Sequence, residues 1–522
     1  MNCSISTINR EVYRDKVLGC WTGKNIGGTL GMPFEWDQNM NDVRFYSQEL
    51  NGEPTPNDDL DLQLIWLMAA EQKGIYHLNE RVLGEYWLNF ITGPWNEYGI
   101  CKSNMVNGLM PPLSGSCNND KWKKSNGAWI RSEVWACIFP GSPDEAALFA
   151  YYDSCCDHSG EGIYAELFTA TMQSAAFVID DIRELIKIGL AHIPADCRIA
   201  KAVKLVCEHY DRGNDFVTAR QALVKDNEDL GWFQAPANIG FVVIGLLYGE
   251  GDFGKSICRA VNCGDDADCT GGTVGALLGI IKGRKAIPEQ WIKPIGESIQ
   301  TCSVATYNSG GLMSLPETLN ELTVRVMRIA DDARRENPAL ISISEGDTRI
   351  SGEHISRFHD ATSVSIRVLN RSPYEFMFDL PFATVIVDYE DGPYLTPGKK
   401  KKITIKMADV SFVQKVISAK LMIPEDWIAV TSQECRFMVQ AANISGVDIE
   451  FIPGEMKDAY CYIPLEVRVN DRFYPYLISI PFQREGAVNH NLPFECRNYY
   501  DSSARRKRRI AEAGNFQSND FH

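Results

Sequence analysis

Two short segments of the sequence place carboxylates where a helix is expected to begin. The first is PTPNDDLDL, residues 54–62, in which Asn57 is a good N-cap and Asp58 and Asp59 fall in the first turn. The second is NCGDDADC, residues 262–269, in which Asp266 and Asp268 precede a glycine-rich helical run. A helix dipole stabilises each such carboxylate by roughly 0.3–1 kcal/mol, so helix capping alone could explain either cluster.

A metal site becomes the better explanation if the two predicted helices lie side by side. The carboxylates would then converge and raise one another's pKa, unless a cation neutralised them. Oxygen ligands suit hard cations such as Mg²⁺, Mn²⁺ or Ca²⁺ better than Zn²⁺. The eight histidines are scattered and form no HExxH motif. The pattern therefore predicts a hard-cation site, with the convergence itself an inference.

The elements that must position these clusters are helices. Residues up to about 340 are rich in Gly, Ala, Leu and Cys, and a helical apolar spacing recurs at Leu60, Leu64, Leu67 and Met68. A second helix is expected over residues 163–179. Glycines recur every four residues at Gly271, Gly275, Gly279 and Gly283, which predicts one smooth helix face that lets another backbone approach closely.

The pattern changes after about residue 350. The segments 361–370 (ATSVSIRVLN), 401–407 (KKITIKM) and 464–470 (PLEVRVN) alternate apolar and polar residues, which predicts strands of an antiparallel β-sandwich. We therefore predict a multidomain protein with an all-α domain over residues 1–345, a β-sandwich accessory domain over 350–490, and a basic, flexible tail over 491–522. The basic run from Arg505 to Arg509 is either a solvated tail or a nuclear or nucleic-acid signal.

Composition limits the function further. The 522 residues include 52 Lys and Arg against 68 Asp and Glu, and the resulting net charge of −16 argues against nucleic-acid binding as the main role. No apolar run reaches the roughly 20 residues that span a bilayer, and charges interrupt the N-terminal segment where a signal peptide would be apolar. We therefore expect a cytoplasmic protein without membrane partners. The sixteen scattered cysteines are expected to be reduced thiols.

Three motifs together resemble the ADP-ribosylglycohydrolase family, which includes the dinitrogenase-reductase-activating glycohydrolases. DKVLGCWTGKNIGGTLGMPFE, residues 15–35, resembles the family's opening helix, G-x-x-x-G-D-x-L-G-x-x-x-E. NDDL, residues 57–60, resembles TDDT, and GDDADCTGGTVGALLG, residues 264–279, resembles GxDTDTxAAxxGALxG. The resemblance covers about residues 10 to 340. It implies an all-α fold with two Mg²⁺ or Mn²⁺ ions in a central cleft.

The resemblance also implies roles for individual residues. The metal ligands would be Asn57, Asp58, Asp59, Asp266, Asp268 and Cys269, and the catalytic residues would be Glu35, Asp59 and Asp266. The segments 125–131 (SNGAWIR) and 157–162 (DHSGEG) would supply the substrate contacts Asn126, Gly127, Ala128 and His158. Asn57, Leu60 and Cys269 each stand where the family has Thr, and a thiol is a poor ligand for Mg²⁺. Asp265 is expected either to add a ligand or to face solvent.

The first functional hypothesis is a metal-dependent glycohydrolase that cleaves an N- or O-glycosidic ADP-ribosyl linkage, on a protein or a small molecule. A metal-dependent hydrolase of another furanoside or nucleoside-like glycoside is the second, and a metal-binding pseudoenzyme is the third. The C-terminal sandwich resembles the β-sandwich modules appended to bacterial carbohydrate enzymes, and a structural lid or dimerisation module is the alternative. Aromatic residues between the clusters could stack on a base or a sugar, or pack in the core: Trp95, Tyr98, Trp122, Trp129 and Trp135.

Overall fold

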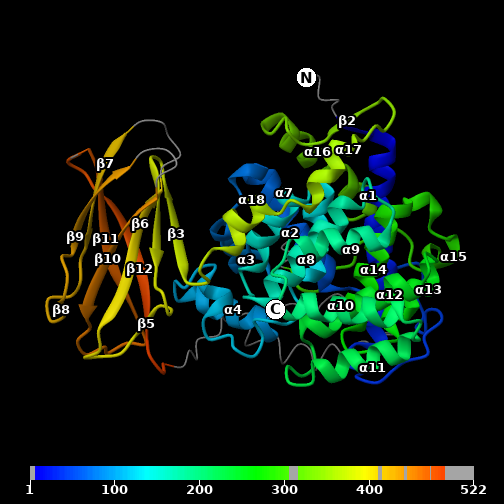
Figure 1. Ribbon diagram of the computed structural model, residues 1–522, viewed down its shortest axis with the longest axis horizontal. Coiled ribbons are helices and arrows are strands. Elements are labelled where there is room, and N and C mark those ends of the chain that lie inside the picture. The colour runs from blue at the N-terminus through cyan, green and yellow to red at the C-terminus, as the bar shows by residue number, and fades with distance from the viewer. Residues whose placement is uncertain (1–5, 305–314, 409–413, 440–443, 471, 488–522) are drawn as a thin grey trace, which may run out of the picture.

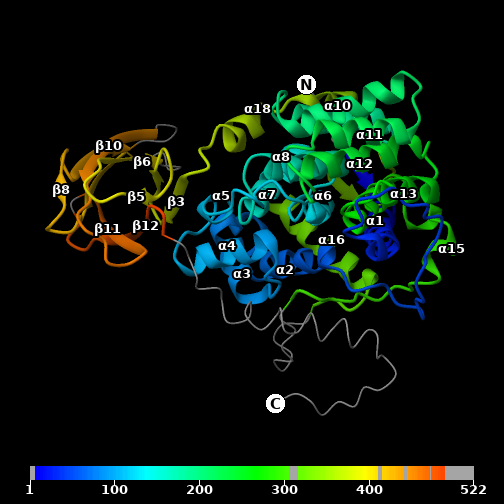
Figure 2. The same ribbon diagram turned by 90° about the horizontal axis from the view of Figure 1, so that it is seen from below.

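The computed structural model describes residues 6–304, 315–408, 414–439, 444–470 and 472–487. Figure 1 shows a large helical part on the right and a smaller part made of strands on the left. The view from below in Figure 2 shows the same division, so the two parts lie side by side along the long axis. The predicted fold class, an all-α domain followed by a β-sandwich, is confirmed.

The helical part consists of helices joined by loops of different lengths. In chain order they are α1 (Arg10–Gly31), α2 (Asp58–Lys73), α3 (Glu80–Phe90), α4 (Asn96–Val106), α5 (Leu113–Ser116), α6 (Glu133–Ile138), α7 (Pro143–Ser154), α8 (Glu161–Ala175), α9 (Ile182–Ala191), α10 (Arg198–Asp211), α11 (Phe216–Asp226), α12 (Ala235–Tyr248), α13 (Phe253–Val261), α14 (Ala267–Lys282), α15 (Glu289–Ile292) and α16 (Leu319–Glu336). The helix expected over residues 163–179 is α8.

Helices α1 and α14 are in direct backbone contact. A Cβ atom placed on Gly23 of α1 would lie 1.9 Å from the carbonyl oxygen of Gly275 in α14, and one placed on Gly279 would lie 2.0 Å from the carbonyl oxygen of Gly19. Only glycine permits this approach, so the predicted glycine face is confirmed. Gly283 differs from the prediction because it follows the end of α14 with a φ of +77°.

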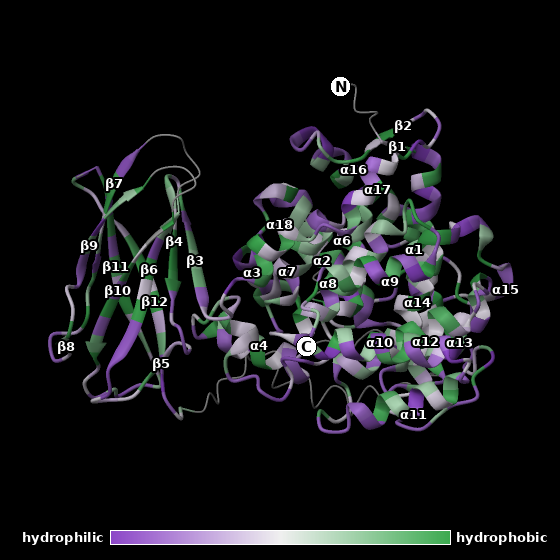
Figure 3. Cartoon of the chain, viewed as in Figure 1, coloured by the Kyte–Doolittle hydropathy of each residue, from purple (hydrophilic) through white to green (hydrophobic). Residues whose placement is uncertain are grey.

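Helix α2 crosses the interior of the helical part. Its residues from Asp59 to Ala70 are all buried, so it has no solvent-facing side. The leucine spacing predicted the helix but understated its burial. Figure 3 shows hydrophobic residues gathered on the inner helices and hydrophilic residues on the outer ones. No helix among the described residues is long and apolar enough to cross a membrane.

A short parallel strand pair joins the beginning and the end of the helical part. Strand β1 (Thr7–Asn9) pairs with β2 (Ser342–Ser344), and α17 (Gly352–Ser356) follows. The predicted strand over residues 361–370 is wrong: α18 (Thr362–Val364) and a π-helical turn (Ser365–Leu369) occupy it. Val364 and Val368 are buried there, while Ile366 is exposed. Their four-residue spacing matches a helix face, and tertiary packing overrides the β-branched alternation.

The C-terminal part contains two five-stranded sheets. Their orders are β3-β4-β6-β10-β8 and β5-β12-β11-β7-β9, antiparallel except for the β5–β12 pair. The strands are β3 (Glu375–Leu380), β4 (Ala383–Asp388), β5 (Tyr394–Leu395), β6 (Lys401–Ala408), β7 (Lys415–Leu421), β8 (Ile428–Ala429), β9 (Glu434–Val439), β10 (Ile444–Ile452), β11 (Tyr460–Val469) and β12 (Tyr476–Arg484). The rings of Phe451 and Phe482, one from each sheet, meet at 5.9 Å and show that the sheets pack face to face.

Polar contacts connect the two parts. Arg371 pairs with Glu80 of α3 at 2.5 Å, and the Tyr462 hydroxyl donates to the carbonyl oxygen of Asn107 at 2.8 Å. The boundaries at residues 345, 350 and 490 stay a prediction. The expected tail over 491–522, including its basic run, lies outside the described residues. Every cysteine that the structure describes is a free thiol.

Candidate active site

The two acidic segments converge at the mouth of the α1–α14 pair. Glu35 follows the short helix that extends α1, and Asp266 and Asp268 begin α14. Carboxylate oxygens of Glu35, Asp266 and Asp268 lie within 4.8 Å of one another. Oxygens of Asp59 and Asp268 form a second such group with the Cys269 sulfur. Asp268 belongs to both groups and therefore lies at the centre of the cluster.

Hydrogen bonds of Asn57 connect the two helix starts. Its Oδ1 accepts from the backbone amide of Asp59 at 2.8 Å, which makes it the N-cap of α2. Its Nδ2 donates to Asp268 Oδ2 at 3.1 Å. The other oxygen of Asp268, Oδ1, is buried and has no hydrogen-bond partner. A buried carboxylate oxygen without a donor is costly, and a bound cation would satisfy it.

Charge repulsion within the cluster supports the same conclusion. Burial, followed by neighbouring carboxylates, raises the pKa of Glu35, of Asp58 and of Asp266 well above the usual range. Burial, followed by the charge of Asp59, raises the pKa of Asp268 to about 6. These residues share excess negative charge in a low-dielectric site, which a divalent cation would relieve. The donor set therefore fits Mg²⁺ or Mn²⁺.

A buried lysine lies on the other side of Asp59. The Nζ atom of Lys24 is 3.0 Å from Asp59 Oδ2 and 3.3 Å from Glu133 Oε1, and it donates to the carbonyl oxygen of Ile130 at 2.6 Å. Burial lowers the pKa of Lys24, but Asp59 and Glu133 outweigh that effect and raise it, so the amine is charged. Sequence reasoning missed Lys24, although a lone cation on the glycine-rich face of a buried helix could have indicated it.

The Cys269 thiol also contacts Asp59. It donates to Asp59 Oδ1 at 3.2 Å. Burial, followed by the charges of Asp266 and Asp268, raises the pKa of Cys269 well above its usual range. The sulfur is therefore a protonated donor in this arrangement. Asp59 Oδ1 thus accepts from a thiol, and Asp59 Oδ2 forms an ion pair with an ammonium but accepts no hydrogen bond.

Two further aspartates of the acidic segments hold the backbone in place. Asp61 accepts hydrogen bonds from the backbone amides of Cys302 and Ser303. Asp265 accepts from the backbone amide of Phe233 and, at 2.7 Å, from Asn238 Nδ2. Asp265 is fully buried, so the expectation that it could face solvent is wrong. Since both of its oxygens accept hydrogen bonds, it anchors the loop before α12.

The backbone beside Glu35 is fixed by unusual conformations. Trp36 has a φ of +72°, Asp265 of +65° and Phe233 of +62°, all in the left-handed region that non-glycine residues rarely adopt. The rings of Trp36 and Phe233 stack with centroids 3.5 Å apart. The Trp36 amide donates to the Asp265 carbonyl at 2.9 Å, and the Asp265 amide donates to the Asp37 carbonyl at 2.7 Å. These contacts attach the Glu35 segment to the start of α14.

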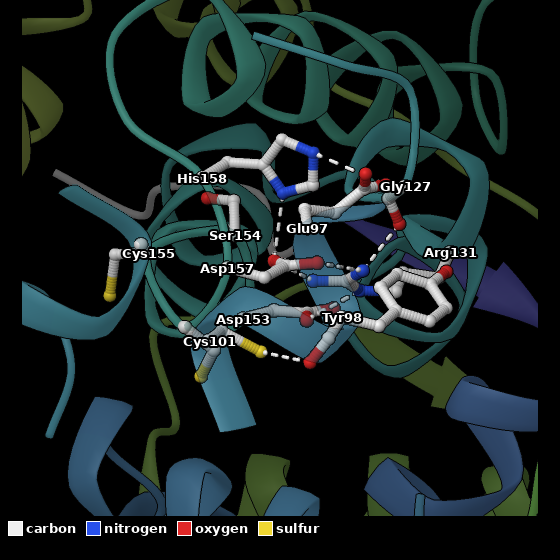
Figure 4. Close-up of polar contacts among 12 residues, drawn as sticks. Glu97, Tyr98, Cys101, Gly127, Arg131, Asp153, Ser154, Cys155, Asp157 and His158 are labelled. Carbon is white, nitrogen blue, oxygen red and sulfur yellow. Dashed lines mark hydrogen bonds and ion pairs between the residues drawn. The ribbon is translucent and has the colours of Figure 1, made fainter. Parts of the chain in front are cut away.

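A buried arginine fixes the backbone of the loop that contains Asn126, Gly127 and Ala128. Arg131 donates to the Gly127 carbonyl and pairs with Asp153 and Asp157, both at 2.7 Å, as Figure 4 shows. Burial opposes ionisation of Asp157, but Arg131 and His158 outweigh it and lower its pKa. Asn126 Oδ1 accepts from the Trp129 indole at 3.1 Å, so the loop has a defined conformation.

His158 is fully enclosed beside this loop. Its Nδ1 lies 2.8 Å from Asp157 Oδ1, and its Nε2 lies 3.1 Å from Ser125 Oγ and 3.9 Å from Glu97 Oε1. Glu97, Asp157 and His158 could by proximity hold a metal ion. Arg131 already supplies a cation to Asp157, so this second cluster is neutralised by the protein itself.

Helix α4 connects the loop to the acidic cluster. The Tyr98 hydroxyl donates to Asp58 Oδ2 at 3.3 Å, and a Cβ atom on Gly127 would lie 2.3 Å from Glu97 Oε1. Sequence reasoning missed Glu97. Of the five aromatic residues considered for stacking, Trp129 and Trp135 are fully buried and pack in the core. Tyr98 contacts the acidic cluster through its hydroxyl, which donates to Asp58 Oδ2.

Comparisons with known proteins identify the family of the helical part. The family model described as ADP-ribosylglycohydrolase matches residues 9–327. An uncharacterized protein of Archaeoglobus fulgidus is 22% identical over 291 residues, which are 53% of this chain and 91% of that protein. A Pseudomonas fluorescens alkylpurine DNA glycosylase, AlkC, bound to DNA containing an abasic site analog, matches with 9% identity over 75% of this chain and 97% of that chain. Its TM-score is 0.13.

The family match includes every segment of the acidic cluster, from Glu35 through Asp59 to Cys269, and it spans more than half of the chain. The sandwich lies outside the matched residues and is an addition to the family pattern. The chain therefore belongs to the ADP-ribosylglycohydrolase family, whose members are hydrolases of glycosidic bonds.

Proposed function

We propose that this protein hydrolyses the glycosidic bond between an ADP-ribosyl group and its carrier in a reaction that requires Mg²⁺ or Mn²⁺. The observation that carries the proposal is the convergence of Glu35, Asp266 and Asp268, together with the buried, unpartnered Oδ1 atom of Asp268. A bound divalent ion would hold ribose hydroxyls and polarise a water molecule beside the anomeric carbon.

The protein's own residues divide the remaining work. Glu35 lies half-buried at the edge of the cluster and would accept a proton from the attacking water at its carboxylate. Asp59, fixed by Lys24 and Cys269, would place negative charge near the positive charge that develops on the ribose ring. Asp266 and Asp268 would bind the ion.

The buried loop at residues 125–131 would position the rest of the substrate. Hydrogen bonds of Arg131 and Trp129 fix its backbone, and Tyr98 connects it to Asp58 of the cluster. In this proposal Asn126, Gly127 and Ala128 contact the substrate directly. His158 positions the loop through Ser125, whose Oγ lies 3.1 Å from its Nε2. A preorganised loop lowers the entropic cost of substrate orientation.

Release of ADP-ribose from an ADP-ribosyl-arginine peptide and from an ADP-ribosyl-serine peptide tests the proposal. Chelator-treated protein should be inactive, and Mn²⁺ should restore release from one of the two substrates. Glu35→Gln should lower kcat by about 10²–10⁴-fold, in proportion to the loss of a general base. Glu53→Gln, which changes an exposed carboxylate a few residues before α2, serves as the matched control and should leave activity unchanged.

Two results would contradict the proposal in different ways. Release from a nucleoside or another furanoside, with no release from either peptide, would retain the reaction and replace the substrate. Metal binding without turnover of any substrate would identify a pseudoenzyme.

A further inference from the structure

We propose that Lys24 occupies the position of one of the two cations expected in the cluster, so that this protein binds a single divalent ion per chain. The inference rests on the proposed metal dependence and concerns how many ions the site holds. It is carried by the different surroundings of two neighbouring carboxylates, Asp59 and Asp268, whose oxygens lie within 4.8 Å of each other.

A cation of the protein already lies against Asp59. The ammonium of Lys24 is 2% exposed and lies against oxygens of Asp59, Glu133 and Ile130 at 3.0, 3.3 and 2.6 Å. Glu133 also accepts from the side-chain amides of Gln63 at 2.9 Å and Gln173 at 3.2 Å. This ammonium therefore replaces the charge that an ion between Asp59 and its neighbours would supply.

Cys269, which contacts the other carboxylate oxygen of Asp59, supports the same conclusion. Cys269 stands where the family has a Thr that can ligate a hard ion, and its thiol donates to Asp59 Oδ1 at 3.2 Å. Mg²⁺ and Mn²⁺ prefer oxygen to sulfur. An ion that used Asp59 would compete with this thiol and with the lysine for its oxygens.

The surroundings of Asp268 are different. Glu35, Asp266 and Asp268 lie within 4.8 Å of one another, and Asp268 Oδ1 is buried without a hydrogen-bond partner. The amide of Asn57 donates to the other oxygen of Asp268, so Oδ1 remains for an ion. The geometry thus points to a single ion position, formed by Glu35, Asp266 and Asp268.

The number of ions can be counted on the intact chain. Chelator-treated protein is equilibrated with Mn²⁺, and bound metal is measured by elemental analysis and by electron paramagnetic resonance. We expect one Mn²⁺ per chain and the six-line spectrum of an isolated ion. Two ions per chain with a spin-coupled spectrum would overturn the inference while leaving metal dependence intact. An absence of bound Mn²⁺ would contradict both this inference and the proposed function.

A pair of variants tests the role of Lys24 itself. Lys24→Met/Cys269→Thr removes the ammonium and restores an oxygen ligand, so bound Mn²⁺ should rise from one to two ions per chain. Cys269→Thr alone should remain at one ion because the lysine is still present. A second ion in Cys269→Thr would show that the thiol, and not the lysine, limits the site. If the double variant does not fold, the count on the unmodified chain still decides the question.

Discussion

Replacing Gly275 by alanine should force α1 and α14 apart. A Cβ atom there would lie 2.1 Å from the carbonyl oxygen of Gly23 and 2.8 Å from its carbonyl carbon. Contacts under 3.0 Å are essentially never seen for real Cβ atoms, so the two backbones must separate by about 1 Å. Both contacted atoms belong to the backbone of Gly23, so neither helix can relieve the contact by a change of side-chain rotamer.

The expected loss of stability follows from two opposing effects. Alanine favours a helix interior over glycine by about 1 kcal/mol. Overpacking of a rigid interior costs about 1–3 kcal/mol and occasionally more, and a gap of about 1 Å forfeits up to half of each contact's dispersion energy. We expect Gly275→Ala to destabilise the protein by roughly 2 kcal/mol after the helix-propensity gain is subtracted. Because Asp268 lies in the first turn of α14, Mn²⁺ affinity should also fall by roughly tenfold to hundredfold.

Urea unfolding monitored by tryptophan fluorescence and calorimetric titration of Mn²⁺ measure the two effects. Gly352→Ala is the matched control, since a Cβ atom on Gly352 would meet nothing within 4 Å. That variant should be neutral or slightly more stable. A Gly275→Ala protein as stable as the unmodified chain, with equal Mn²⁺ affinity, would refute the claim that backbone contact between these helices holds the site together.

Two other predictions concern charge. Arg131→Met should lower the free energy of unfolding by about 3–5 kcal/mol, because Asp153 and Asp157 would lose their buried cation. Arg183→Met, which removes an exposed ion pair, is the control and should change the free energy of unfolding by less than about 1 kcal/mol. Equal effects in urea titrations would contradict the structural role of Arg131. Mn²⁺ affinity should rise with pH from about 5 to about 7, because protons occupy Asp268, with its pKa of about 6, at the acidic end of that range. Calorimetry in buffers of different ionisation enthalpy should detect proton release at pH 6, and affinity that falls as pH rises would contradict this sign.

Local patterns were enough to predict most of the fold and the acidic cluster. Asn57 caps α2, and the glycines at every fourth residue of α14 meet those of α1. Both signals depend on neighbouring residues in the sequence, which is why they could be read in advance. The sandwich followed from alternation on segments such as Lys401–Ala408, where the structure has strand β6.

Features that depend on distant partners were not predictable. Lys24 acquires its role only because Asp59 and Glu133 approach it from other helices. Asp265 could not be distinguished from a ligand until Phe233 and Asn238 were seen to use its oxygens. The segment 361–370 contains β-branched residues in alternation and a four-residue repeat of valines at once. The choice between strand and helix there was made by packing.

The parallel pairing of β1 with β2 has a consequence for how this fold can be rearranged. Thr7 and Ser342 are direct partners, so the helical domain begins and ends at nearly the same point in space. A domain with adjacent ends can be inserted into a surface loop of a host protein or circularly permuted with a short linker. The sandwich can likewise be exchanged for another module at this junction, with α1 and α14 left uninterrupted.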